Sequence, residues 1–205
     1  MESVGIHRRL GGFSHTVAMK IVLVAAAAVF LYLSGILPFA LSLCLAVGVH
    51  EIGHISAAML LGADIMSFKG TFLGLRICYS SISLGTAGEC IVNLSGSLFG
   101  LLSAAAVSIT PLIRYDFFIS FAALSVTLAL VNLLPVRGLD GGSTVMCILD
   151  RFMLPDRSEK IMNIISTASA IAFWVVSIRI QLRSGVNLSI LALSVYFLVV
   201  TLRRA

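Results

Sequence analysis

Residues 43–63 have the sequence LCLAVGVHEIGHISAAMLLGA. It is apolar enough for a membrane helix, yet His50, Glu51 and His54 fall within one short segment of it. An ionisable side chain at membrane depth costs about 2.5–3.5 kcal/mol on insertion scales. These three side chains therefore need a partner that offsets the cost, and the rest of the chain indicates which partner it is.

The composition of the chain predicts an integral membrane protein. Of its 205 residues 59% are hydrophobic and 11% are charged, against about 25% charged in typical soluble domains. The apolar residues fall in runs long enough to cross a bilayer, about 17–25 residues each. Lys and Arg lie at the ends of these runs, as topology control requires, so the net charge of +5 does not indicate a nucleic-acid partner.

The apolar runs predict an all-α polytopic membrane protein with about six transmembrane helices. The expected spans are about 17–34, 38–61, 91–110, 117–135, 161–178 and 186–202. The segment at about 63–90 is rich in glycine and in β-branched or aromatic residues. It predicts a short membrane-associated β-hairpin or re-entrant segment after the second helix.

We expect a single intramembrane domain over residues 1–205, with residues 1–16 as a cytoplasmic tail. The polar stretches are too short to build a separate soluble domain. With the N-terminus inside and six spans, ten Lys and Arg side chains fall on the inner side. Only Arg114, Arg179 and Arg183 fall on the outer side, and Arg137, in the motif at 132–142, is left out of the count. This bias predicts that both termini are cytoplasmic.

The spacing of the two histidines indicates a metal ion as the missing partner. Residues four apart on a helix lie on one face, so His50 and His54 can aim two imidazole nitrogens at one point. Glu51 is rotated by about 100° and can flank a metal without binding it. HExxH on a helix is typical of zinc proteases, where it supplies two ligands and a general base.

Three other interpretations of the motif compete with this one. A solvated helix face is excluded, because the flanks LCLAVGV and ISAAMLL are apolar. A structural cluster of buried polar side chains and a metal-transport site both remain open on these residues alone.

A hydrolytic zinc site normally has three protein ligands and an open position for water, so a third ligand is expected at membrane depth. Asp140 is the best candidate, in NLLPVRGLDGG at 132–142. Pro135 and Gly138 end the preceding helix, and we expect Gly141 and Gly142 to let the chain turn tightly around the carboxylate. The other side chains considered lie in the polar tail or at span ends: His7, His15, Glu89 and Asp116.

Depth in the membrane supports Asp140 independently. His50 lies about 18 Å along a helix that enters from outside near Pro38, and Asn132 lies about 22 Å from the same side. Both therefore fall in the cytoplasmic half. A helix interrupted after Asn132 can place Asp140 at the depth of the two histidines.

Together, the motifs at 50–54 and 132–142 resemble the site-2 protease family of intramembrane zinc metalloproteases in order, spacing and membrane setting. The short six-span chain also looks like the branch that contains the sporulation protease processing the sigma-K precursor. NLSGSLFG at 93–100 keeps Gly96 of a family element, but Ser97 stands where many members have proline.

The resemblance implies one Zn²⁺ per chain, held by His50, His54 and Asp140. It implies that Glu51 is the general base and later the proton donor. Asn132 and Pro135 belong to the family's Asn-x-x-Pro element, which implies substrate binding and, for Asn132, a catalytic role. The hairpin would offer a strand edge to an unwound substrate.

On this interpretation the chain is a zinc metalloendopeptidase of a bacterial cytoplasmic-type membrane, with its active site toward the cytoplasm. It would cut a membrane-tethered protein in or near its transmembrane segment, for example a pro-sigma factor in sporulation. A regulatory or inhibitory membrane protein is a further expected partner besides the lipid bilayer. The alternatives are a membrane metal transporter or metal-binding sensor with the same ligands, and an inactive scaffold, against which the intact motif argues.

Overall fold

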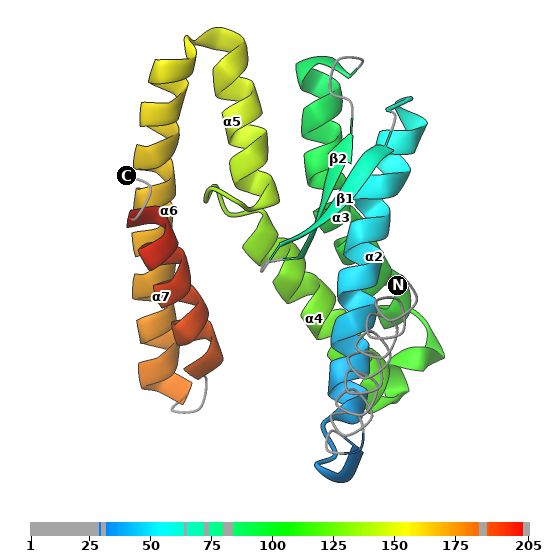
Figure 1. The fold of residues 1–205 in the computed structure, drawn as a ribbon. Coiled ribbons are helices and arrows are strands. Elements are labelled where there is room, and N and C mark those ends of the chain that lie inside the picture. Colours follow the sequence, from blue (N-terminus) through cyan, green and yellow to red (C-terminus); the bar gives the residue numbers. More distant parts are fainter. Residues whose placement is uncertain are drawn as a thin grey trace, which may run out of the picture.

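Long helices and one pair of short strands make up the described part of the chain (Figure 1). The computed structural model describes residues 29, 32–63, 65–71, 74–79, 84–184 and 188–202. The elements are α2 (Leu37–Leu60), β1 (Ile65–Thr71), β2 (Gly74–Tyr79), α3 (Gly85–Ser108), η2 (Pro111–Arg114), α4 (Asp116–Asn132), α5 (Asp140–Phe152), α6 (Pro155–Ser184) and α7 (Leu188–Leu202).

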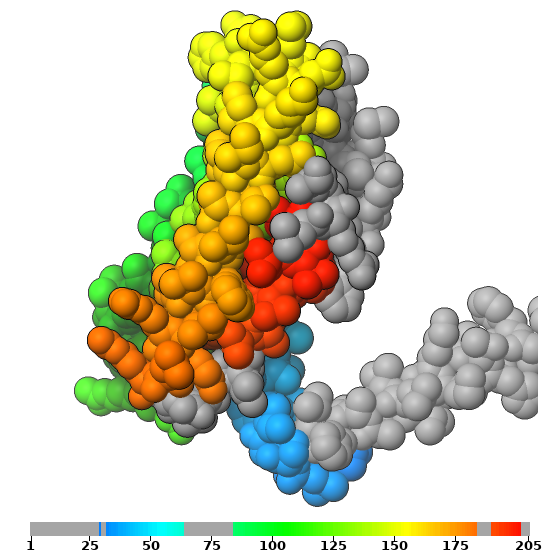
Figure 2. All heavy atoms as spheres, turned by 90° about the vertical axis from the view of Figure 1, so that its left-hand side faces the viewer, coloured from blue at the N-terminus to red at the C-terminus, as the bar shows by residue number. Residues whose placement is uncertain are grey.

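The helices pack as one group and one pair, with α5 between them. Helices α2, α3 and α4 contact one another, α5 packs on α3 and α6, and α7 packs on α6. Figure 2 shows α6 running along one side of the molecule, with α7 beside it. Helix α5 is one connection between the α6–α7 pair and the α2–α4 group. The 133–139 loop is another, since Val136 and Leu139 form a buried cluster with Phe197 of α7.

Small residues line the helix interfaces, and many large apolar side chains face outward. The buried positions include Ala46, Ala58, Ala104 and Ala129. Many leucine and isoleucine side chains are exposed instead, such as Leu60 at 87%. Lipid is as apolar as leucine, so membrane helices associate through close backbone packing at small residues. This distribution is what a chain surrounded by lipid requires.

Three of the described helices are long and apolar enough to cross a membrane: Leu37–Leu60, Gly85–Ser108 and Pro155–Arg183. Two shorter apolar helices, Asp116–Asn132 and Ile190–Thr201, correspond to the fourth and sixth expected spans. The first expected span, about 17–34, lies mostly outside the described residues. The count of six spans therefore stays a prediction.

Helix α2 ends where the sequence expects it to end. Gly62 has a φ of +75°, and its N–H donates to the Met59 carbonyl at 3.0 Å. The Ala63 N–H donates to the Ala58 carbonyl at 2.9 Å. This pair of bonds is a Schellman motif, which needs a left-handed residue and so favours glycine.

After α2, strands β1 and β2 pair antiparallel, with Thr71 opposite Gly74. Their association with a membrane stays a prediction.

Two boundaries and one whole element differ from the expectations. Helix α3 begins at Gly85, so residues 85–90 belong to a helix and not to the hairpin region. Helix α6 begins at Pro155, before the expected span, since proline is well tolerated in the first turn of a helix. Helix α5 was not expected, because it is too short for a span and has two glycines of low helix propensity in its first turn.

Candidate metal and catalytic site

The two histidines of α2 lie on one face of the helix, as their spacing predicts. His50 is only 5% exposed, and the two rings meet edge to face with centroids 4.8 Å apart. Their Nε2 atoms are 3.2 Å from each other. Both rings therefore present the same nitrogen to the same place.

Asp140, the first residue of α5, completes this group. Its Oδ2 atom lies 3.1 Å from His50 Nε2 and 3.3 Å from His54 Nε2. Helix α4 ends at Asn132 and α5 begins at Asp140, so the interrupted helix brings the carboxylate to the histidines, as the depth argument predicts. Within the described residues, these three are the cluster of His, Cys, Asp or Glu side chains that could hold a metal ion.

The two glycines after Asp140 act differently from the expectation. They do not form a turn, since both lie inside the first turn of α5 and neither has a positive φ. A Cβ on Gly141 would lie 2.2 Å from the Leu133 carbonyl oxygen, and one on Gly142 would lie 2.1 Å from that of Val136. They let the 133–139 loop pack directly against α5, and Gly138, with a φ of +94°, makes the turn.

The partner of His54 fixes the protonation of its ring. His54 Nδ1 lies 2.7 Å from the Val92 carbonyl oxygen of α3. A carbonyl only accepts, so Nδ1 carries the proton, and in the neutral ring Nε2 is a bare lone pair. That lone pair faces the Asp140 carboxylate and the His50 ring. A carbonyl partner on the second nitrogen is the usual setting of a metal-binding histidine.

The geometry of the three atoms fits a tetrahedral metal ion. Zinc bonds of about 2.0–2.1 Å at tetrahedral angles place neighbouring ligand atoms about 3.3–3.4 Å apart, close to the observed 3.1, 3.2 and 3.3 Å. Asp140 Oδ2 is buried and receives no directed hydrogen bond from the described residues. A proton on His50 could form a hydrogen bond between only one pair of these three atoms. A cation at the centre of the triangle would attract all three atoms.

Asn132 and Glu51 flank the triangle. The Asn132 amide nitrogen lies 3.3 Å from His50 Nε2, at the last residue of α4. Glu51 is half-buried on α2 and within electrostatic range of the His54 ring. Pro135 lies in the 133–139 loop, outside the triangle.

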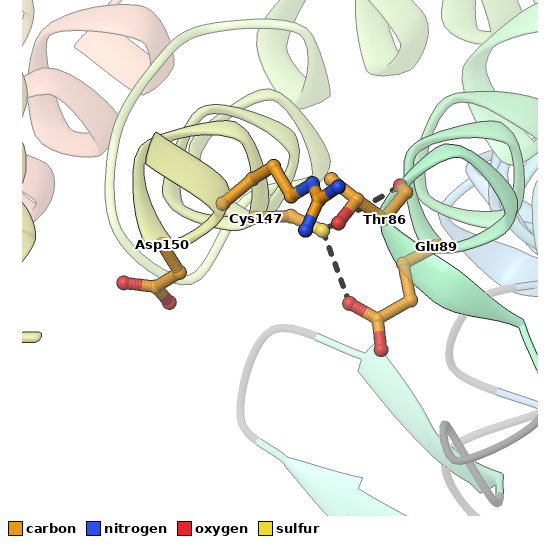
Figure 3. Close-up of a pocket in the computed structure, with 5 residues that line it drawn as sticks. Thr86, Glu89, Cys147 and Asp150 are labelled. Carbon is orange, nitrogen blue, oxygen red and sulfur yellow. Dashed lines mark hydrogen bonds between the residues drawn. The ribbon is translucent and has the colours of Figure 1, made fainter. Parts of the chain in front are cut away.

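A cavity in two parts, which share Glu89, Cys147 and Asp150, lies between α3 and α5. One part, of about 340 Å³, is lined among others by Asn93, Arg137 and Gly142. A second part, of about 230 Å³, is lined by Thr86, Glu89, Cys147, Asp150 and Arg151 (Figure 3).

Glu89, considered as a third ligand from the sequence, is bonded elsewhere. The Cys147 thiol donates to Glu89 Oε2 at 3.0 Å (Figure 3). Burial and the Glu89 carboxylate raise the pKa of Cys147 to about 12, so the thiol stays a donor at neutral pH.

Comparison with known proteins gives one partial family match and one similar structure. Residues 86–173 match peptidase family M50. The match covers 88 of the 205 residues, so the resemblance extends over less than half of the chain. It contains Asp140 and Asn132 but begins after the HEIGH motif, so the motif is separate evidence.

The structure is also similar to that of the site-2 protease from Methanocaldococcus jannaschii, with a TM-score of 0.63 and 18% identity. The likeness covers 91% of this chain and 86% of the other, and at this identity it shows the fold. A search of curated proteins gave no match.

Sequence reasoning missed the Val92 carbonyl. Every residue has a backbone carbonyl oxygen, so the residue type at position 92 does not indicate this contact. It becomes visible only when the packing of α3 against α2 is known.

Proposed function

We propose that this chain is an intramembrane zinc metalloprotease of the site-2 protease type. The observation that carries the proposal is the triangle of His50 Nε2, His54 Nε2 and Asp140 Oδ2. Glu51, on the same helix as the histidines, is within electrostatic range of His54. Two imidazoles and one carboxylate are the donor set of hydrolytic zinc sites. The match to peptidase family M50 supports the same reaction class.

His50, His54 and Asp140 would hold one zinc ion per chain. Bound there, zinc supplies a Lewis acid that polarises a peptide carbonyl and makes water acidic near neutral pH. Glu51 takes a proton from the attacking water at its carboxylate and returns it to the departing amine nitrogen. The Asn132 amide N–H, which points at the same place, donates to the carbonyl oxygen as negative charge develops there. Pro135 fixes the loop along which the substrate lies.

Water must reach these residues although they are surrounded by apolar helices. We place this route in the cavity between α3 and α5, because two residues that line it, Asn93 and Gly142, are sequence neighbours of Val92 and Asp140. Its other part is polar, with Glu89, Asp150 and Arg151 at its wall.

The proposed setting is a bacterial cytoplasmic-type membrane with about six spans, both termini inside and the site toward the cytoplasm. The excess of Lys and Arg on one side of the spans supports this orientation. The β1–β2 pair would be a membrane-associated hairpin, which binds an unwound segment of a membrane-tethered substrate by strand addition. A pro-sigma factor of sporulation is the substrate we favour, and a regulatory membrane protein is an expected partner.

The experiment is co-expression of the protein with membrane-tethered transcription-factor precursors, followed by purification and zinc analysis. Glu51→Gln should abolish cleavage and keep the zinc, because it removes the base and none of the ligands. Glu159→Gln, the same change at an exposed side chain of α6, should cleave like the wild type. Full cleavage by purified Glu51→Gln protein would overturn the proposal.

Zinc flux into vesicles separates this proposal from a transporter. A transport path needs sites in series, whereas the described residues contain one suitable cluster. We expect no flux above that of empty vesicles, and flux that persists in Glu51→Gln would favour transport.

A further inference from the structure

The ring of His54 lies directly against the backbone of α3 at Gly96. A Cβ atom on Gly96 would lie 2.3 Å from His54 Nε2, and 2.7 Å from both Cδ2 and Cε1. Carbon atoms in contact normally stay about 3.5–4.0 Å apart. Any side chain at position 96 would therefore displace the imidazole, and in particular the nitrogen that faces Asp140.

A second contact holds the same ring from the same helix. Val92 lies four residues before Gly96, so both are on one face of α3. Its carbonyl accepts the His54 Nδ1–H at 2.7 Å. The ring is thus fixed in position by the surface at Gly96 and in rotation by the bond to Val92.

The approach of the two helices has a separate cause. A Cβ on Gly53 of α2 would lie 2.7 Å from the Ser95 carbonyl oxygen and 2.9 Å from the Gly96 Cα. Helices α2 and α3 therefore cross where a glycine of each meets the other. This crossing brings His54 within reach of α3, whereas the missing side chain at Gly96 makes room for the ring itself.

We infer that Gly96 and the Val92 carbonyl form a seat on α3 that orients His54 Nε2 toward the metal ion. This inference rests on the proposed function, since it assigns positioning residues to the same site. Neither residue would touch the substrate or the zinc ion. Their effect is to hold one ligand in the tautomer and direction that the triangle requires.

The test compares Gly96→Ala with Gly100→Ala, the same substitution one turn further along α3. Gly100 is also buried, but a Cβ there would meet the Ser125 carbonyl oxygen at 3.4 Å and the Ala129 Cβ at 3.8 Å, which are tolerable contacts. The readouts are zinc affinity, by competition with a chromophoric chelator, and the visible absorption spectrum of the Co²⁺-loaded protein.

Gly96→Ala should weaken zinc binding by about 10–100-fold, the cost of losing a residue that supports a ligand, and should change the cobalt spectrum. Gly100→Ala should leave both unchanged. Wild-type affinity together with a wild-type spectrum in Gly96→Ala would overturn the inference.

A stability cycle without metal keeps the inference testable if Gly96→Ala folds poorly. His54→Ala removes the ring, so adding Gly96→Ala to it should cost no further thermal stability in detergent. A further loss of stability would mean that the added methyl clashes with something other than His54. Because the cycle needs no zinc, it also separates the two proposals. If the wild-type protein binds no zinc, the proposed function is contradicted. The contact between Gly96 and His54 is then still tested by the stability measurements on the single and double variants.

Discussion

The two halves of the candidate site are built in opposite ways. Helix α2 supplies His50 and His54 from an unbroken helix, where a spacing of four residues is enough to align them. The other half supplies Asp140 from the point where α4 has ended and α5 begins, beyond the 133–139 loop. The first half depends on local periodicity, and the second depends on contacts between segments.

The space around the glycines shows the same contrast. A Cβ on Gly48 of α2 would meet nothing within 4 Å. A Cβ on Gly141 or Gly142 would run into backbone carbonyls of the loop. Backbone atoms cannot move aside as a flexible side chain can, so the position of Asp140 is sensitive to a change that α2 would tolerate at Gly48, although not at Gly53.

The largest effect is expected when the second half loses its ligand. Asp140→Asn removes the negative charge from the triangle and should weaken zinc binding by at least about 100-fold, since loss of a mere supporting residue costs about 10–100-fold. Zinc content after dialysis against a chelator, and cleavage, would both fall. Asp156→Asn, at an exposed position of α6, is the control. Zinc retained in full by Asp140→Asn would mean that the two histidines suffice.

Asn132 marks the boundary between the halves, as the last residue of α4. Asn132→Ala should lower kcat by about 100–1000-fold, as removal of one oxyanion donor does, and leave zinc content unchanged. Steady-state kinetics with a cleavable substrate and zinc analysis measure the two effects. If zinc is lost together with activity, Asn132 supports His50 and does not act on the substrate.

A glycine pair tests the contrast itself. Gly141→Ala should push α5 away from the loop and lower activity by about 100-fold, the cost of a shift of about 1 Å in a catalytic group. Gly48→Ala should leave activity unchanged and stabilise α2 slightly, since alanine is favoured over glycine in helices by about 1 kcal/mol. Equal effects of the two substitutions on cleavage would show that Asp140 is no more sensitive to packing than the histidines.

The half of the site on α2 could be predicted from the sequence more completely than the half that contains Asp140. His50 and His54 could be placed together because their geometry is set within one helix. Asp140 could be named as a candidate, but the role of Gly141 and Gly142 was wrong. Their freedom from Cβ serves packing against the loop and not a turn, and the sequence does not show which backbone lies opposite. Helix α5 and the Val92 carbonyl escaped prediction because both depend on contacts with α3.

The smallest effect concerns the far end of α5, where Cys147 ties this helix to Glu89 of α3. The pKa of Cys147 is raised to about 12 from an ordinary value of 9.0. The folded protein therefore keeps the thiol proton over a pH range in which the unfolded chain releases it. Stability from this bond is present below pH 9 and is lost as the pH rises from 9 toward 12.

The Cys147→Ser variant has no group at this position that titrates in that pH range. Its thermal unfolding temperature should therefore fall less than that of the wild type between pH 8 and 10. Zinc content at pH 7.5 should be equal in the two proteins, because the thiol lies outside the triangle. Parallel pH profiles would show that the bond from Cys147 to Glu89 does not help to hold α5 against α3.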